Sequence, residues 1–184
     1  KNIYLHDSAT MNFTSTGGSI NILGATSLTM DNNSTINLNT GTLWVMNVDS
    51  SGGKNCVHEI DPGLGYTGTR ICPGGTGFST SQRGLAYDPD TDSYYAGSWN
   101  DGMIHHFASN GTMLDEEYVG LDIAGLAYNP KTKHLFAVVS ADPGPVYVLD
   151  AANQYSVLGS FEIPGFSGYS GAGLEIDCDG NLWA

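Results

Sequence analysis

The sequence predicts an all-β protein, a β-propeller built from four-stranded antiparallel blades, and three observations lead to this prediction. A short motif recurs at blade spacing, each copy is followed by the same turn and strand, and the composition favours strands. The chain of 184 residues is 40% hydrophobic, enough to build a core, and contains 25 glycines. Gly, Ser, Thr and Asn between short apolar runs are typical of strands joined by tight turns.

The repeated motif begins Gly-Leu-Ala-Tyr. It occurs as Gly-Leu-Ala-Tyr-Asp-Pro at 84–89, as Gly-Leu-Ala-Tyr-Asn-Pro at 125–130, and as Gly-Leu-Glu-Ile-Asp at 173–177. The copies begin 41 (125 − 84) and 48 (173 − 125) residues apart. Because propeller blades repeat every ~40 to 50 residues, the motif predicts the first strand of successive blades.

Two further strands repeat with the motif. A polar turn leads into strands that begin at Tyr94, Leu135 and Leu182, and Leu43 begins a fourth copy of this second strand. A third strand places a β-branched residue beside an aromatic residue or His, starting at residues 3, 57, 104 and 146. These matches at one offset indicate repetition of a whole sheet.

The clearest unit spans residues 83–119. Its strands are expected to end at Pro89 and to cover 94–99, 103–108 and 112–119. Its hairpins turn at Asn-Asp-Gly (100–102) and Asn-Gly (110–111), where Asn and Gly tolerate positive φ. Such a sheet needs cover on both faces, so consecutive units are expected to pack face to face, as in a propeller. A β-sandwich is the alternative architecture, although it does not require the repeated element.

The domain organisation follows from the repeat. Residues 41–184 are expected to form blades, the last one incomplete. Residues 1–40 are expected to be a β-rich segment, either half a blade plus a first strand or a few turns of β-solenoid or separate β-structure. Joining the ends into a ring leaves about 4 residues for a connection that takes 9 to 13 elsewhere. The sequence therefore favours a partial ring cut from a longer chain over a small four-blade ring.

Charge and cysteine content exclude some functions. With 19 acidic and 6 basic residues the net charge is −13, which opposes binding to nucleic acid. No apolar stretch approaches the ~18 to 20 residues of a membrane span. Three widely spaced cysteines do not form a zinc motif. Cys56 and Cys72 are expected to form a disulfide if they lie on neighbouring strands, with free buried thiols as the alternative and Cys178 left over.

The motif blocks resemble those of a known class of repeats. These blocks are the Gly-Leu-Ala-Tyr-Asp-Pro motif, Tyr-Tyr-Ala-Gly-Ser-Trp-Asn-Asp-Gly at 94–102 and Gly-Leu-Glu-Ile-Asp-Cys-Asp-Gly-Asn-Leu-Trp-Ala at 173–184. They resemble propeller-like repeats of large secreted bacterial proteins, some of which carry a subtilisin-like peptidase domain. The resemblance covers about residues 40–184 and implies an extracellular or cell-surface accessory or adhesive module. It transfers no catalytic residue, since the peptidase motifs around Asp, His and Ser are absent from the sequence.

Acidic turns are the candidate metal sites, with calcium as the candidate cofactor. The residues are Asp88, Asp90, Asp92, Asp177 and Asp179. Their alternation resembles the start of a calcium loop, but Ser93 and Trp99 stand where an EF-hand needs Gly and Glu. As turn residues that hydrogen-bond their own backbone, these side chains need no metal.

A candidate ligand site follows from propeller geometry. Connections between strands two and three and between blades share one end of the ring, so certain side chains are expected to cluster there. They are Trp99, Asn100, Asp101, Gln82, Arg83, Asp142, Phe166 and Tyr169. Aromatic faces flanked by amides and carboxylates suit sugar rings or peptides. The alternative is that Trp99 merely closes its hairpin.

Other candidates are weaker. His105 and His106 are adjacent on a strand, so they face opposite sides and cannot share one ion, and ring packing explains His105. Ser167 and Ser170 do not satisfy the Gly-x-Ser-x-Gly pattern of a nucleophile elbow. Glu116 is interpreted as a charge that guards an edge strand.

The sequence leaves three functional hypotheses open. The first is a non-catalytic extracellular module for binding, adhesion or structural assembly, with a glycan or protein partner. The second is a propeller segment of a secreted hydrolase or peptidase. The third is a subunit of a surface layer or filament that assembles through open blade edges. Fold alone does not choose among them.

Overall fold

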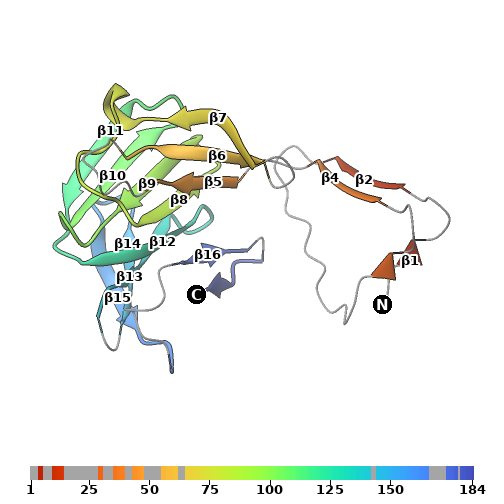
Figure 1. Cartoon of the computed structure of the whole chain (residues 1–184). Coiled ribbons are helices and arrows are strands. Elements are labelled where there is room, and N and C mark those ends of the chain that lie inside the picture. The colour runs from red at the N-terminus through yellow and green to blue at the C-terminus, as the bar shows by residue number, and fades with distance from the viewer. Residues whose placement is uncertain are drawn as a thin grey trace.

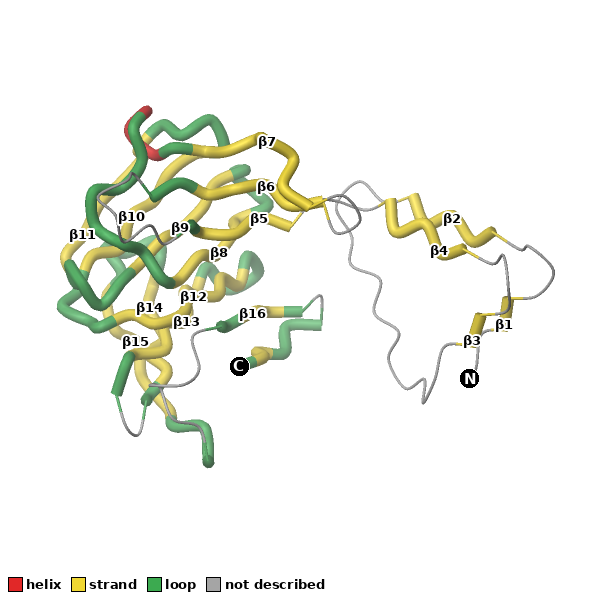
Figure 2. Tube along the Cα trace, in the orientation of Figure 1, coloured by secondary structure: helices red, strands yellow, loops and turns green. Residues whose placement is uncertain are grey.

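The structure is built from strands. The computed structural model describes residues 43–47, 55–61, 65–141, 144–165, 173–177 and 179–184, together with the backbone of short strands at 4–5, 10–14, 29–30 and 35–39. Among these residues the one helical element is a single 3-10 turn at Pro73–Gly75 (Figure 2). A helix long and apolar enough to cross a bilayer does not occur in this described part of the chain.

The strands follow the order that the repeat predicts. In chain order they are β1 (Tyr4–Leu5), β2 (Thr10–Thr14), β3 (Thr29–Met30), β4 (Thr35–Asn39), β5 (Leu43–Met46), β6 (Val57–Asp61), β7 (Gly65–Ile71), β8 (Gly84–Asp88), β9 (Ser93–Gly97), β10 (Met103–Ala108), β11 (Met113–Tyr118), β12 (Ile123–Asn129), β13 (His134–Val139), β14 (Val146–Asp150), β15 (Ser156–Phe161), β16 (Glu175–Ile176) and β17 (Leu182–Trp183). The unit predicted at 83–119 is confirmed as β8–β11, and each predicted boundary lies within two residues of the observed one.

Four antiparallel sheets make up the blade region. Two of them, β8–β11 and β12–β15, are complete four-stranded up-and-down sheets. A three-stranded sheet, β5–β6–β7, precedes them, and the pair β16–β17 follows. In Figure 1 these sheets follow one another through the body of the molecule. Neighbouring sheets meet through their inner strands, since β8 contacts β12 and β12 contacts β16. This arrangement is that of successive propeller blades, and the fold-class prediction is confirmed.

Each gap between neighbouring blades is filled by an apolar core. Between β5–β7 and β8–β11 the buried residues include Val57, Tyr94 and Phe107. Between β8–β11 and β12–β15 they include Tyr95 and Leu126. A further cluster, which includes Val138 and Leu174, joins β12–β15 to β16–β17. Burying each large apolar side chain contributes ~1.5 to 3 kcal/mol, so face-to-face packing is the main stabilisation of the blades.

Strand β9 shows how one blade serves two cores. Successive side chains of a strand point to opposite faces. Tyr94 therefore packs against the preceding blade and stacks on Phe107 at 5.7 Å between ring centroids. Its neighbour Tyr95 packs against the following blade and contacts Tyr128 at 5.0 Å. The adjacent pair of tyrosines in the sequence thus reflects a strand that is buried on both sides.

The turns between first and second strands share one construction. The side chains of Asp88, Asn129 and Asp177 each accept a hydrogen bond from the backbone N–H two residues further on, at 2.9, 3.0 and 3.0 Å. Such turns, closed by an Asx side chain, explain why the fifth residue of the motif is Asp or Asn. The same hairpins contain one residue with positive φ, at Asp92 and Lys133 in the two complete blades.

The strands before residue 43 pair differently from a blade. Strand β1 pairs with β3 and β2 with β4, both in parallel. In both pairs the partners lie 25 residues apart in sequence (29 − 4 and 35 − 10). Half a blade at this end would pair antiparallel through a tight hairpin, so the parallel pairing departs from that expectation. The constant parallel offset distinguishes these pairs from the antiparallel hairpins of the blades.

Candidate functional site

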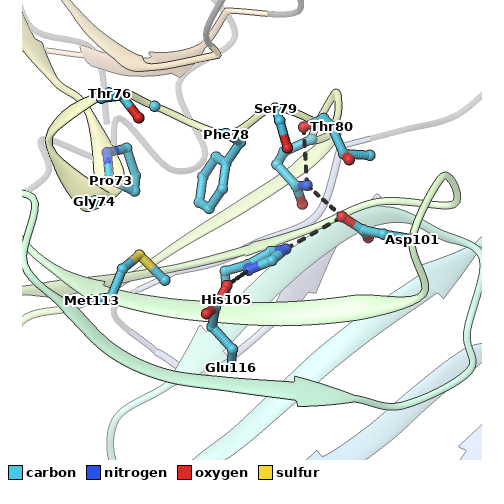
Figure 3. Close-up of a pocket in the computed structure, with 12 residues that line it drawn as sticks. Pro73, Gly74, Thr76, Phe78, Ser79, Thr80, Asp101, His105, Met113 and Glu116 are labelled. Atoms are coloured by element: carbon cyan, nitrogen blue, oxygen red, sulfur yellow. Dashed lines mark hydrogen bonds and ion pairs between the residues drawn. The ribbon is translucent and has the colours of Figure 1, made fainter.

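A cavity lies beside the outer strands of the β8–β11 blade. It has a volume of about 230 Å3. One wall comes from the connection between β7 and β8, from Pro73 to Gln82, and includes Phe78. The other comes from the blade itself, through the β9–β10 hairpin and strands β10 and β11. Figure 3 shows the His105 and Phe78 rings beside each other in the lining, with Asp101 and Glu116 on either side of the imidazole.

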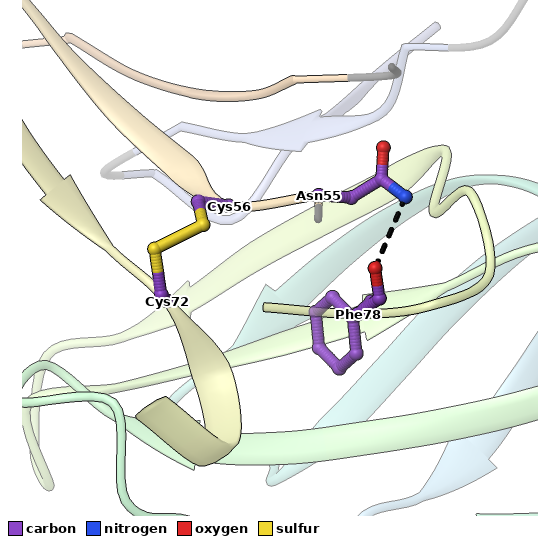
Figure 4. Close-up of a disulfide and its surroundings, with 4 residues drawn as sticks. All are labelled: Asn55, Cys56, Cys72 and Phe78. Atoms are coloured by element: carbon purple, nitrogen blue, oxygen red, sulfur yellow. Dashed lines mark hydrogen bonds between the residues drawn. A yellow bond between two sulfur atoms is a disulfide. The ribbon is translucent and has the colours of Figure 1, made fainter. Parts of the chain in front are cut away.

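A disulfide anchors the start of the β7–β8 connection, which forms one wall of the cavity. Cys56, just before β6, is bonded to Cys72, just after β7 (Figure 4). The two cysteines follow the geometry that the sequence allowed, because they flank paired strands of one sheet. Cys178 lies outside the described residues. A loop of 16 residues is closed by this bond, which in the chain-entropy account stabilises the fold by about 3 kcal/mol.

Hydrogen bonds fix the β7–β8 connection at two further points. The backbones of Asn55 and Phe78 exchange two hydrogen bonds of 3.0 and 2.9 Å, and the Asn55 side-chain amide donates to the Phe78 carbonyl at 3.2 Å (Figure 4). The N–H of Gly74 donates to the carbonyl of Gly111 at 3.0 Å. The connection is therefore attached both to the blade before it and to the blade after it.

A chain of polar side chains crosses the cavity wall. Gln82 Nε2 donates to Asp101 Oδ2 at 2.9 Å. The same Asp101 oxygen lies 3.3 Å from Nε2 of His105, whose Nδ1 lies 2.8 Å from Glu116 Oε1. Ionised carboxylates accept hydrogen bonds but donate none. His105 can therefore donate to both carboxylates only as the imidazolium, with a proton on each ring nitrogen.

Gln82 is a buried residue with one polar atom unsatisfied. Its side chain is fully buried (0% exposed), and Oε1 has no hydrogen-bond partner in the described structure. The orientation of the amide is fixed, because Nε2 donates to Asp101 and to the Thr80 carbonyl at 3.2 Å. Reversing the amide would turn its oxygen toward two acceptors. A buried carbonyl without a donor costs about 1 to 3 kcal/mol, so this atom calls for an explanation.

The structure brings together five of the eight residues predicted for the ligand site. Gln82 and Asp101 share the hydrogen bond described above. The Arg83 guanidinium lies over the Trp99 ring, 4.4 Å from its centroid. Asn100 Nδ2 donates to the Ser81 carbonyl at 3.0 Å. The loop between blades and the β9–β10 hairpin therefore meet at one end of the blade. The other three predicted residues, Asp142, Phe166 and Tyr169, lie outside the described residues.

Four of the candidate calcium residues belong to hydrogen-bonded turns, and Asp90 pairs with a lysine of the next blade. Asp88 and Asp177 close the Asx turns, in which neutral Asn129 takes the same part in the blade between them. Asp90 pairs with Lys133 of the next blade at 2.7 Å, while Asp92 accepts a hydrogen bond from Tyr87 at 3.0 Å. For Asp179, the backbone N–H is the donor in the Asp177 turn. A group of three or more metal-ligating side chains is not found within the described ranges. Calcium binding stays a prediction.

The two adjacent histidines face opposite sides, as the strand period predicts. His105 contacts the Phe78 ring at 4.7 Å between centroids, whereas His106 stacks on Tyr95 at 4.3 Å on the other face. His106 Nε2 also lies 2.7 Å from Ser93 Oγ. Burial lowers the pKa of His106 below its usual value, although the nearby charges of Asp88 and Asp115 oppose this.

Sequence reasoning missed the polar partners of His105. It assigned a packing role to this ring and an edge-guarding role to Glu116, but the two side chains are in contact. The sequence did contain a signal for this contact. A hairpin that turns between Asn110 and Gly111 places His105 opposite Glu116, and the observed strand register has this pair. The contribution of Phe78 had no such signal, because it depends on the path of the long connection.

The surroundings of His105 do not fit the role of a general base. A hydrolase needs a base that is free to take a proton from its nucleophile. Both ring nitrogens of His105 face carboxylates, so this imidazole is not placed to do so. Ser167 and Ser170 lie outside the described residues. The cavity instead presents hydrogen-bonding groups and an aromatic face, which suit recognition of a ligand.

Comparisons with known proteins bear on the fold. No protein family and no curated protein matches the sequence. Among solved structures, the chain is similar to hydrazine synthase of Kuenenia stuttgartiensis, with a TM-score of 0.53 and 18% identity over 77% of this chain and 37% of that one. Lower similarity is found to the WD40 domain of Neurospora crassa Pan2 (TM-score 0.42, 13% identity, 58% and 30% covered). A luciferin-regenerating enzyme has a TM-score of 0.48 with 12% identity over 67% and 43%.

These likenesses concern architecture alone. The chain spans 37% of the hydrazine synthase chain, the one of the three with a TM-score above 0.5. Blades of four antiparallel strands packed face to face define the class of the protein as β-propeller-like. At these identities the similarity carries neither an activity nor a ligand to this chain.

Proposed function

We propose that this chain is an extracellular, non-catalytic propeller segment that binds a glycan or protein partner at the end of the β8–β11 blade. One observation carries the proposal: the loop between blades and the β9–β10 hairpin converge there, beside a cavity that holds a buried, unsatisfied amide. Propeller loops that converge at one end of a blade form a fixed surface on a rigid scaffold, a common setting for recognition.

The side chains at this end support recognition. The Trp99 ring is 38% exposed and is backed on one face by Arg83, so it offers a rigid apolar surface. Asn100 and Asp101 lie next to it and supply amide and carboxylate groups. Tyr and Trp rings flanked by hydrogen-bonding groups contribute strongly to interfaces at low entropic cost.

Two observations support an extracellular location. A disulfide such as Cys56–Cys72 persists in oxidising surroundings and is rare in the reducing cytosol. The sequence blocks also resemble repeats of large secreted bacterial proteins. Adhesion to a cell surface or a neighbouring cell is the role that this resemblance favours within the proposed function.

A ligand screen with matched variants tests the proposed site. The chain is screened against arrays of glycans and of surface-protein peptides, and hits are measured by calorimetry. Trp99→Ala is expected to lower the affinity for a hit by at least about tenfold, as is typical of a buried aromatic anchor. Leu43→Ala removes an exposed side chain from β5, away from both candidate interfaces, and is expected to leave affinity unchanged. Equal affinity of Trp99→Ala and the parent chain would refute the site.

Assembly through an open edge is the second candidate, and strand β15 is the observation that favours it. This outer strand, Ser-Val-Leu-Gly-Ser-Phe, carries no charge and exposes Val157, Leu158 and Phe161. Exposed apolar edge strands without charge are templates for pairing with another chain. Light scattering against concentration tests this candidate, since Leu158→Lys is expected to abolish any self-association. Self-association that survives this variant would exclude β15 as the interface.

A further inference from the structure

The polar wall of the cavity presents acceptors. The donors of its fixed side chains are already used: Gln82 Nε2 on Asp101 and Thr80, and both ring nitrogens of His105 on carboxylates. What remains is the unpaired Gln82 Oε1, the carboxylates of Asp101 and Glu116, and the hydroxyl groups of Thr76, Ser79 and Thr80, which accept as well as donate. Every one of these groups can accept, so such a wall favours a ligand that donates several hydrogen bonds.

The charge of the cavity selects among such ligands. Its lining contains Asp101, Glu116 and His105, but neither Lys nor Arg among the described residues. Even with His105 as the imidazolium, the three side chains sum to one negative charge. The chain as a whole carries −13. A cation is therefore attracted and an anion repelled, both over long range and at the wall itself.

The remaining wall is apolar. Phe78 is buried and presents its ring to the cavity, while Pro73 and Met113 lie nearby (Figure 3). Methylene groups pack well against such surfaces while a charged head reaches polar partners. The cavity, at about 230 Å3, is below the ~300 to 1,000 Å3 of small-molecule sites. It suits one side chain better than a whole organic ligand.

We propose that this cavity binds the protonated amine of a lysine side chain that a protein partner presents. The ammonium has three donors and no acceptor, and the lining offers acceptors on both sides of the His105 ring, Gln82 with Asp101 on one side and Glu116 on the other. Its four methylene groups would pack along Phe78. The inference rests on the proposed binding function and narrows it, because it commits to a protein as the partner and to lysine as the residue that is recognised.

A bound metal ion fits the same residues less well. Asp101 and Glu116 lie at opposite nitrogens of the His105 ring, so the three groups do not converge on one point. The described residues contain no cluster of three or more side chains with the geometry of a metal site. An ammonium is less demanding, because one carboxylate within reach is enough and water can accept from the N–H groups that meet no side chain.

The test uses short blocked peptides and the whole chain. A pentapeptide with lysine between pairs of glycines is titrated while NMR follows the side-chain amide of Gln82 and the ring of His105. Peptides with norleucine, acetyl-lysine or arginine at the same position, and a glucosamine oligomer, are titrated in parallel. We expect saturable shifts with the lysine peptide and at least about tenfold weaker binding of the norleucine and acetyl-lysine peptides, because both lack the charge.

Variants on one strand provide the matched comparison. Glu116→Gln keeps the size of the side chain but removes its charge, and it is expected to weaken lysine binding about fivefold or more and to reduce its dependence on salt. Glu117→Gln makes the same change on the opposite face of β11 and is expected to have no effect. Gln82→Met removes the unpaired acceptor and is expected to weaken binding further.

The outcomes separate this inference from the proposed function. Equal binding of lysine and acetyl-lysine peptides, or equal effects of Glu116→Gln and Glu117→Gln, would overturn the inference. Tighter binding of the glucosamine oligomer or the arginine peptide would assign the cavity to that cation and overturn the lysine proposal. If a ligand loses affinity in Trp99→Ala but not in Glu116→Gln, the proposed function stands and lysine binding in the cavity is refuted. If no ligand is found whose affinity falls in Trp99→Ala, the proposed function is refuted instead.

Discussion

A β-carbon on Gly84 would lie 2.7 Å from Cγ of Leu126 and 2.9 Å from its backbone nitrogen. Gly84 opens the repeated motif on β8, and Leu126 lies on β12, the inner strand of the next blade. The inner strands of these two blades thus approach closely enough to exclude any side chain at this position. Gly84 is therefore explained by packing between blades rather than by a special backbone angle, whereas a β-carbon on Gly173, in the third copy, would meet nothing within 4 Å.

Gly84→Ala is therefore expected to destabilise the fold. The free energy of unfolding should fall by about 1 to 3 kcal/mol, as for other cases of overpacking against rigid backbone. Denaturation in urea measures it. Gly159→Ala on β15 is the control, because a β-carbon there meets nothing within 4 Å and no loss is expected. If the two variants have equal stability, the close approach of β8 and β12 is wrong.

Loss of the disulfide should cost a comparable amount. Replacing Cys56 and Cys72 together with Ala opens the loop of 16 residues and is expected to lower the free energy of unfolding by about 3 kcal/mol. Unfolding curves with and without a reductant measure the effect. Reductant should destabilise the parent chain but not the double variant. If the free energy of unfolding of the parent chain is the same with and without reductant, the disulfide does not stabilise the fold.

The stability of the fold should depend on pH through His106. Burial lowers the pKa of this imidazole in the folded chain, whereas the unfolded chain takes up the proton near 6.5. The unfolded state thus binds more protons as the pH falls below that value, and stability declines until the lower, folded pKa is reached. His106→Phe keeps a ring on Tyr95 and should flatten the slope of stability at pH values below 6.5. An unchanged slope in this variant would contradict the assignment.

Asp177 should titrate at an unusually low pH. The Asn181 amide, the Trp183 indole and backbone N–H groups donate to its carboxylate and lower its pKa to about 2. Stability from these bonds is present above the usual value of 3.8 and is lost as the pH falls from there through the folded pKa. Asn181→Ala should raise the pKa of Asp177, and carbon NMR of the carboxyl group measures it. A pKa that does not move would exclude Asn181 as the main cause.

The blades were predictable because their signals are local. Strand β10 has the predicted bounds, 103–108, since an Asn-Asp-Gly turn precedes it and an Asn-Gly turn follows it. Strand β9 ends two residues early, at Gly97, because the Ser98 hydroxyl accepts the N–H of Asn100 at 3.0 Å and begins the turn. Turn chemistry and alternation act over a few residues, so a single sequence contains them.

The candidate site was predictable only in part. The meeting of Trp99 and Arg83 follows from blade topology alone. The wall around Phe78 does not, because it depends on Asn55, 23 residues away in sequence, and on the disulfide. The parallel pairs before residue 43 were equally hard to predict, since their partners are 25 residues apart (29 − 4 and 35 − 10) and no motif marks them. Contacts over such separations depend on the folded chain rather than on local pattern.

Strand β9, with Tyr94 and Tyr95 on its two faces, also limits how such a chain can change during evolution. A blade of this kind is not an independent unit, because its removal leaves the blades on both sides with an uncovered apolar surface. Duplication succeeds only if the new blade matches two different neighbours at once. That requirement favours near-identical inner segments, which is what the repeated Gly-Leu-Ala-Tyr motif preserves while the outer strands are free to diverge.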